Sequence, residues 1–240
     1  MKFERENGIK VAGVELNDRS LIRMGWLLPL LTVFSSMTVH AFSGNARDIP
    51  FFISEADYPG LERWIFTTGL TLSGIILCII ANRFKTLFTV FGKPKMLRFS
   101  FLAGLTTGTS LVVLAFANMY DVLALHCVFA ILVFGGGLAW GGSTHLLLDS
   151  KGREQKTLRR VAFSIALLGF VIMNTAITGY IVMNRTKLSE SASLSIRLND
   201  IQAAIDFAAP AEYLLFLGLV LTLASFESDV KSIQSTDSNE

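Results

Sequence analysis

Charged residues are scarce in this sequence, making up 17% of its 240 positions. A soluble domain of this size normally carries about 25% charged residues. Hydrophobic residues account for 52% of the chain, and the mean hydropathy is +0.53. This composition excludes a soluble globular enzyme and predicts an integral membrane protein.

Cysteine and histidine are also rare, with two cysteines and three histidines in the whole chain. Two thiols are too few for a disulfide scaffold or a thiolate metal site. The sequence contains no H-x-x-x-H, C-x-x-C or H-E-x-x-H spacing, no phosphate-binding glycine loop and no G-x-S-x-G turn. We therefore predict no metal, no cofactor and no enzymatic activity, and we expect no nucleic acid partner.

Long apolar runs are what the sequence does contain. A helix that spans a membrane needs roughly 20 predominantly apolar residues, because the hydrocarbon is about 30 Å thick. Six stretches meet this requirement, which predicts an all-α, six-helix transmembrane bundle over residues 22–226. The predicted spans are Ile22 to Phe42, Trp64 to Asn82, Phe99 to Asn118, Val122 to Leu148, Val161 to Met183 and Phe207 to Phe226.

Basic residues divide unevenly between the two sets of connectors. Sixteen of the 21 Lys and Arg residues lie in or beside the two tails and the second and fourth connectors, which all fall on one side. Because Lys and Arg in short loops stay in the cytosol, both termini are predicted to be cytosolic. Residues 1–21 and 227–240 are then cytosolic tails, the second of them disordered, and residues 43–63 and 184–206 form the large outer loops.

A few polar residues lie inside the predicted spans. His126 and Glu212 fall at a similar depth near the outer ends of the fourth and sixth spans, with Asn118 closing the third span and Asn174 deeper in the fifth. One interpretation is an ordinary interhelical hydrogen bond that fixes the packing. The other is a His–carboxylate pair that binds a ligand or proton and senses luminal acidity, since imidazole titrates near neutral pH.

Glycines recur at four-residue spacing in the third and fourth spans. Gly104 with Gly108, and Gly137 with Gly141, are predicted to let helix backbones approach closely. The spacing indicates packing rather than catalysis.

The basic inner loops carry a second candidate role. Their first interpretation is the topology signal already described. The second is contact with anionic, phosphoinositide-type lipid headgroups, which attract basic residues near the membrane surface. The candidate contacts are Arg83, Lys85, Arg159 and Arg160.

The first outer loop is too apolar for a solvated linker. Between Ile49 and Trp64 it holds three further large apolar rings, two prolines and three acidic residues. We expect it to fold back over the outer end of the bundle. Its candidate motif residues are Pro50, Ser54, Glu55, Pro59 and Glu62.

This loop and several later elements resemble the Frag/DRAM/Sfk family of six-span membrane proteins, which includes the damage-regulated autophagy modulators. The likeness follows the order of that family along nearly the whole chain. The matching residues are Pro50, Ile53-Ser54-Glu55, Pro59, Glu62, Phe66, Asn82-Arg83-Phe84-Lys85, Ala117-Asn118, His126, Ala130, Phe134, Gly136, Ala211-Glu212-Tyr213, Ser225-Phe226 and Asp229.

The resemblance implies a non-enzymatic regulator of autophagy or lysosomal membrane traffic, located in lysosomes or endosomes, with membrane lipids and cytosolic proteins as partners. A different branch implies a lipid-organising or lipid-handling protein of the plasma membrane or Golgi, in which the four intramembrane polar residues line a path. A third hypothesis, an enzyme that uses His126 as base with Glu212 as its orienting group, lacks an accompanying nucleophile or metal set.

Overall fold

The computed structural model describes residues 8–11, 14–148, 155–184 and 194–237. A short antiparallel hairpin of β1 (Ile9–Val11) and β2 (Val14–Leu16) precedes the helices. The helices are α1 (Asp18–Phe42), α2 (Leu61–Leu87), α3 (Pro94–Leu114), α4 (Met119–Leu148), α5 (Lys156–Met183), α6 (Leu194–Asp200), α7 (Gln202–Ala224) and α8 (Phe226–Asp237).

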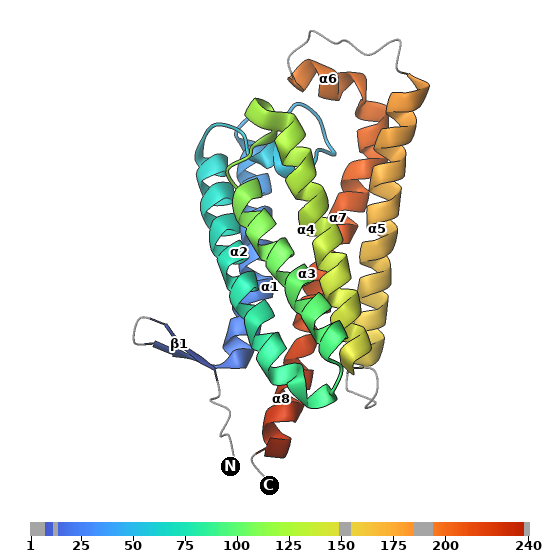
Figure 1. Ribbon diagram of the computed structural model, residues 1–240. Helices are drawn as coiled ribbons and strands as arrows, with labels where there is room; N and C mark the ends of the chain where they lie inside the picture. The colour runs from blue at the N-terminus through green and yellow to red at the C-terminus, as the bar shows by residue number, and fades with distance from the viewer. Residues whose placement is uncertain (1–7, 12–13, 149–154, 185–193, 238–240) are drawn as a thin grey trace.

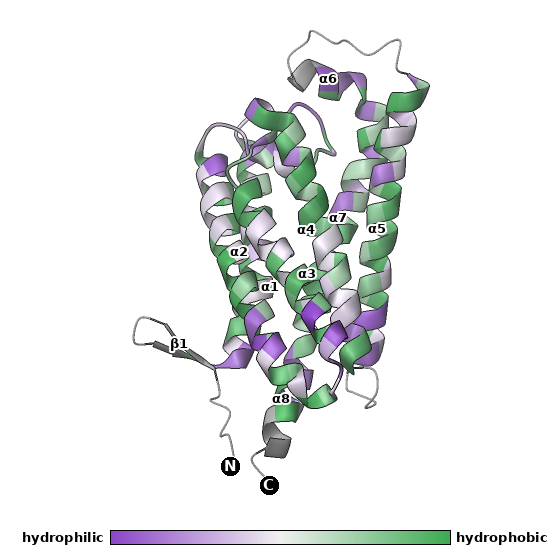
Figure 2. Cartoon of the chain, in the orientation of Figure 1, coloured by the Kyte–Doolittle hydropathy of each residue, from purple (hydrophilic) through white to green (hydrophobic). Residues whose placement is uncertain are grey.

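Six of these helices are long and apolar enough to cross a membrane, which confirms the predicted all-α six-helix bundle. They run side by side along one axis (Figure 1), and hydrophobic residues predominate along much of their length (Figure 2). The ends of the described chain lie together, at what we call the terminal end. The loop of residues 43–60 and helix α6 lie at the opposite cap end. The cytosolic placement of the terminal end stays a prediction.

Helices α1 to α4 pack as sequential neighbours, and glycines set the closest approach between α2 and α3. A Cβ atom on Gly74 would lie 2.6 Å from the Gly108 carbonyl oxygen, and one on Gly108 would lie 2.5 Å from Cys78 Sγ. Only a residue without a side chain fits such a contact. The predicted packing role of Gly108 is confirmed.

Helices α5 and α7 form a second tight pair that the sequence analysis did not identify. A Cβ on Gly169 would meet the Ala211 carbonyl oxygen at 2.5 Å, and one on Gly218 would meet that of Ala162 at 2.6 Å. These glycines lie on different helices and far apart in the chain, so no four-residue spacing marks them. Helix α4 contacts this pair in its terminal half, where Gly137 packs near Leu219.

Several predicted boundaries are corrected: α2 ends at Leu87 rather than Asn82, α5 starts at Lys156 rather than Val161, and α7 starts at Gln202 rather than Phe207. Helix α1 starts at Asp18 rather than Ile22, because the Asn17 side chain caps it by accepting a hydrogen bond from the Ser20 N–H at 2.7 Å. Helix α3 ends at Leu114, four residues before Asn118. The tail predicted to be disordered contains α8, whose buried Val230 and Ile233 belong to the core of the bundle.

Candidate functional site

The cap half of the molecule holds a cleft between α4 on one side and α5, α6 and α7 on the other. Its volume is about 390 Å³. Most of its walls are apolar, and at its rim Ile131 is 53% exposed and Ile181 41% exposed. Figure 1 shows α4 and the α5–α7 pair diverging toward the cap end, above their contacts in the terminal half. The cleft therefore opens sideways, through the apolar surface of the bundle.

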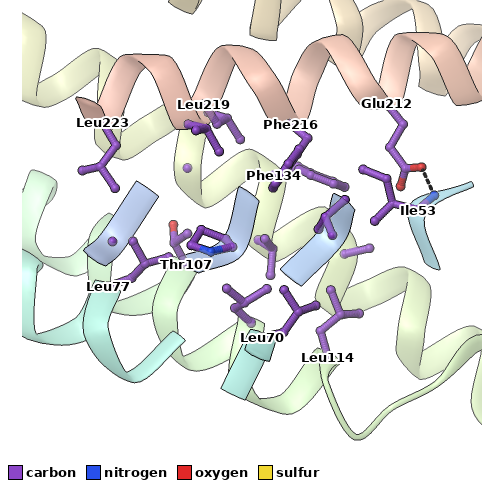
Figure 3. Close-up of a pocket in the computed structure, with 18 of the residues that line it drawn as sticks. Ile53, Leu70, Leu77, Thr107, Leu114, Phe134, Glu212, Phe216, Leu219 and Leu223 are labelled. Atoms are coloured by element: carbon purple, nitrogen blue, oxygen red, sulfur yellow. Dashed lines mark hydrogen bonds between the residues drawn. The ribbon is translucent and has the colours of Figure 1, made fainter. Parts of the chain in front are cut away.

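A second cavity, of about 130 Å³, lies inside the bundle among α1, α2, α3, α4 and α7. Apolar side chains such as Leu70, Leu77, Phe216 and Leu219 line its length, and Glu212 lies at one end (Figure 3). The cleft and the interior cavity share part of their lining. The shared residues are Ser54, His126, Ala130, Phe134 and Glu212.

Glu212 is held by the backbone of the outer loop. Its Oε2 atom accepts a hydrogen bond from the Ile53 N–H at 2.8 Å, drawn as a dashed line in Figure 3. The side chain is 7% exposed, and no Lys, Arg or His of the described residues pairs with it. The loop thus closes the bundle directly above a buried carboxyl group.

His126 is held by the turn between α3 and α4. Its Nδ1 atom lies 2.7 Å from the Ala117 carbonyl oxygen. A carbonyl oxygen only accepts, so Nδ1 carries the proton in this hydrogen bond. Among the described residues, His126 and Glu212 form no hydrogen bond or ion pair with each other. The predicted pair is two separately held side chains in the wall shared by the cleft and the cavity.

The two candidate asparagines have different surroundings. Asn174 lines the cleft, where its Nδ2 donates to the Phe170 carbonyl at 2.7 Å. Asn118 lines neither cavity and instead caps α4, because its Oδ1 accepts from the backbone N–H groups of Tyr120 and Asp121. The prediction that Asn118 supports the intramembrane polar pair is wrong, because its side-chain oxygen accepts hydrogen bonds from N–H groups in the first turn of α4.

The outer loop folds over the bundle as predicted, and Glu55 fixes it. Its carboxylate caps a single 3-10 turn by accepting from the Phe52 N–H at 2.9 Å and binds Arg47 in an ion pair of 2.7 Å. Tyr120 donates its hydroxyl hydrogen to the Glu55 carbonyl at 2.9 Å. Ser54 lines both cavities, whereas Pro50 lies half-buried in the loop and Pro59 is exposed.

Two further acidic residues at the cap end, Glu62 and Asp57, are buried. Glu62 accepts from Asn45 Nδ2 at 2.9 Å and lies 3.5 Å from Nδ1 of the buried His40, a contact that the sequence analysis did not predict. Asp57 is 1% exposed, and its carboxylate oxygens accept no hydrogen bond from the described residues. Burial raises the pKa of Asp57 to about 7, although Arg63 at 3.4 Å opposes the shift and Asp121 adds to it.

Two of the four predicted lipid-headgroup contacts are engaged within the protein. Arg159 is 1% exposed and binds Ser225 and Asp229, with its guanidinium 4.4 Å from the Phe226 ring centroid. Arg83 forms a two-point ion pair with Asp18 at 2.7 and 2.8 Å. The prediction is therefore wrong for Arg159, which cannot reach a headgroup, and Arg83 is committed to Asp18.

The other two basic candidates are exposed. Lys85 extends over the Phe101 ring at 4.3 Å, and Arg160 lies on the outer face of α5. Contact between these two side chains and anionic lipid stays a prediction.

No group of three His, Cys, Asp or Glu side chains in the described ranges is arranged to hold a metal ion. The chain matches no model of a known protein family, no curated protein and no solved structure. Membership of the Frag/DRAM/Sfk family stays a prediction from the matching residues in the sequence.

Proposed function

We propose that this chain is a non-enzymatic integral membrane protein that binds a lipid chain in the cleft between α4 and α5–α7. The observation that carries the proposal is the direction in which the cleft opens. Its rim residues Ile131 and Ile181 are apolar and exposed on the faces of membrane-spanning helices. A lipid tail in the bilayer can therefore enter without crossing water.

The chemistry of the walls supports the same function. An apolar groove of about 390 Å³ gives water few hydrogen-bonding partners, whereas hydrocarbon fills it with dispersion contacts. Met173, Ile177 and Leu123 contribute flexible or branched side chains that suit an acyl chain. Polar residues lie in the wall shared with the interior cavity, on α5 and on α6, so an amphiphile in the cleft meets both apolar and polar groups.

A photoactivatable diacyl lipid in nanodiscs tests this proposal. After irradiation of the purified protein, peptide mass spectrometry should place most of the label on α4 and α5 residues of the cleft. Ile177→Trp should reduce that label severalfold because the indole fills the groove. Ile172→Trp is the matched control, since Ile172 lies on the same helix outside the cleft lining. Label spread evenly over all six spans, unchanged by Ile177→Trp, would contradict lipid binding in the cleft.

The cellular role implied by the family resemblance is a separate proposal. We infer regulation of autophagy or lysosomal traffic only from that resemblance, with proteins on the cytosolic face as partners. A tagged chain scored against lysosomal, Golgi and plasma-membrane markers tests it. A lysosomal or endosomal location supports the regulator, whereas a Golgi or plasma-membrane location supports the lipid-organising branch.

A further inference from the structure

Three polar side chains in the lining of the cleft each leave a hydrogen-bond acceptor without a partner among the described residues. In Glu212, Oε2 is occupied by the Ile53 N–H and Oε1 has no partner among the described residues. In His126, Nδ1 donates to Ala117, so the neutral ring leaves Nε2 as a bare acceptor. Both side chains are more than nine-tenths buried, and both line the cleft.

Asn174 adds a third acceptor from the opposite wall. Its Nδ2 donates to the Phe170 carbonyl, and its Oδ1 has no partner among the described residues. Three polar side chains from α4, α5 and α7 therefore each present an acceptor in one largely apolar cleft.

The remaining polar groups of the lining include donors, and the charged ones lie at the exposed α6 edge of the cleft. The hydroxyl groups of Ser54 and Thr178 can both donate and accept. Arg197 and Asp200 on α6 are exposed and carry opposite charges, so they add no net charge at that edge of the cleft. A buried carboxylate is stable only with a cation or several donors, and Ile53 supplies one donor.

We propose that the cleft selects a single-chain amphiphile whose head group donates hydrogen bonds, either a protonated amine or a hydroxyl. The head group lies among Glu212, His126 and Asn174, and the chain follows the apolar walls toward Ile131. An amine also supplies the positive charge that a buried Glu212 carboxylate needs, whereas a carboxylate head group would bring a second carboxyl group beside Glu212 and no hydrogen-bond donor for His126 or Asn174. This inference rests on the proposed lipid-binding function and adds the head-group chemistry.

Competition among three amphiphiles of equal chain length tests the proposal. Octadecylamine, octadecanol and octadecanoate are added at matched mole fractions to nanodiscs that contain the photoactivatable diacyl lipid. The amine should halve the cleft label at a mole fraction about tenfold below that needed for octadecanoate, because charge-assisted hydrogen bonds are the strong ones. The alcohol should fall between the two.

Matched variants test which side chains give the cleft its preference for an amine over a carboxylate head group. Glu212→Gln keeps an oxygen for the Ile53 N–H but replaces the free acceptor with a donor, so the tenfold ratio should approach one. Asn174→Leu, which removes an acceptor without touching the loop, should lower the ratio about threefold. Glu227→Gln is the control, because Glu227 lies at the terminal end and lines neither cavity. The wild-type ratio should persist in this control.

The outcomes separate the two proposals. Strong cleft labelling with equal competition by all three amphiphiles, or with octadecanoate the strongest, overturns the head-group proposal and leaves lipid binding standing. A ratio that is unchanged in both Glu212→Gln and Asn174→Leu also overturns it. Absence of label in the cleft refutes the proposed function itself.

Discussion

The two ends of the bundle treat buried charge differently. At the terminal end, buried Arg159 is paired with buried Asp229, and Arg83 binds Asp18 through two hydrogen bonds. At the cap end, within the described part of the chain, Glu212 has one backbone donor and no cation, and the Asp57 carboxylate has an arginine at 3.4 Å but accepts no hydrogen bond. The two terminal-end carboxylates are each bonded to an arginine, whereas the carboxyl groups of Glu212 and Asp57 at the cap end form no hydrogen bond with a cationic side chain among the described residues.

This difference indicates that the two ends of the bundle have different roles. An arginine bonded to a buried carboxylate compensates its charge, and disruption of the pair leaves a buried charge without its partner. Incompletely satisfied groups lower stability, and their unused acceptors become useful only when something binds them. The cap end is therefore where we place ligand binding, and the terminal end is where we place structural anchoring.

The largest effect on stability should come from breaking the ion pair between Arg159 and Asp229. Arg159→Met leaves the Asp229 carboxylate buried without its arginine, which should cost about 3–5 kcal/mol and lower the unfolding temperature by on the order of 10 °C. Thermal unfolding of purified protein in detergent measures this change. Arg98→Met, at an exposed position of α3, should move the unfolding temperature by less than about 2 °C. Equal shifts of the unfolding temperature for the two variants would contradict a structural role for the Arg159–Asp229 ion pair.

A smaller, pH-dependent effect should appear at the cap end. Because the folded pKa of Asp57 is raised to about 7, the folded state holds a proton that the unfolded state releases near pH 4. Its contribution to stability is present below about pH 4 and is lost as the pH rises through about 7. Asp57→Asn should therefore stabilise the protein at pH 8 by about 2–4 kcal/mol and leave it nearly unchanged at pH 4.

Unfolding temperatures recorded from pH 4 to pH 8 check this prediction. Asp48→Asn, at an exposed position in the same loop, should keep the wild-type pH profile. A profile for Asp57→Asn that parallels the wild type would assign the pH dependence to another group.

The smallest predicted effect concerns the start of α4. Asn118→Ala removes the side-chain acceptor for the Tyr120 and Asp121 N–H groups and should cost about 1 kcal/mol. Asn82→Ala, at an exposed position inside α2, should cost less than about 0.5 kcal/mol. If Asn118 instead served the cleft, its substitution would change lipid labelling more than stability.

Local features of the structure could be predicted from the sequence, whereas contacts between distant residues could not. The spans followed from uninterrupted apolar runs, and Gly108 followed from its spacing to Gly104, because both signals are local. The approach of Gly169 to Ala211 joins residues on different helices, so no short pattern contains it. Arg159 resembled a surface residue because it lies in a basic loop segment, yet helical rotation turns it inward onto Ser225.

In the candidate site, too, the residues could be predicted from the sequence but their hydrogen-bond partners could not. Its members His126, Asn174 and Glu212 were identified because polar side chains are conspicuous in apolar spans. Their actual partners, the backbone groups of Ala117, Phe170 and Ile53, were not identifiable, since every residue carries the same backbone groups. The cleft could not be predicted from the sequence either, because it depends on the divergence of α4 from the α5–α7 pair.

The sequence by itself determined that this chain forms six membrane-crossing helices and which few polar residues they carry, because hydropathy acts over each segment alone. Only the tertiary structure decided which charges are paired and which acceptors face the cleft. Pairing depends on side-chain direction and helix separation, and those are fixed by contacts between residues far apart in the chain, such as Arg159 with Asp229 and Ile53 with Glu212.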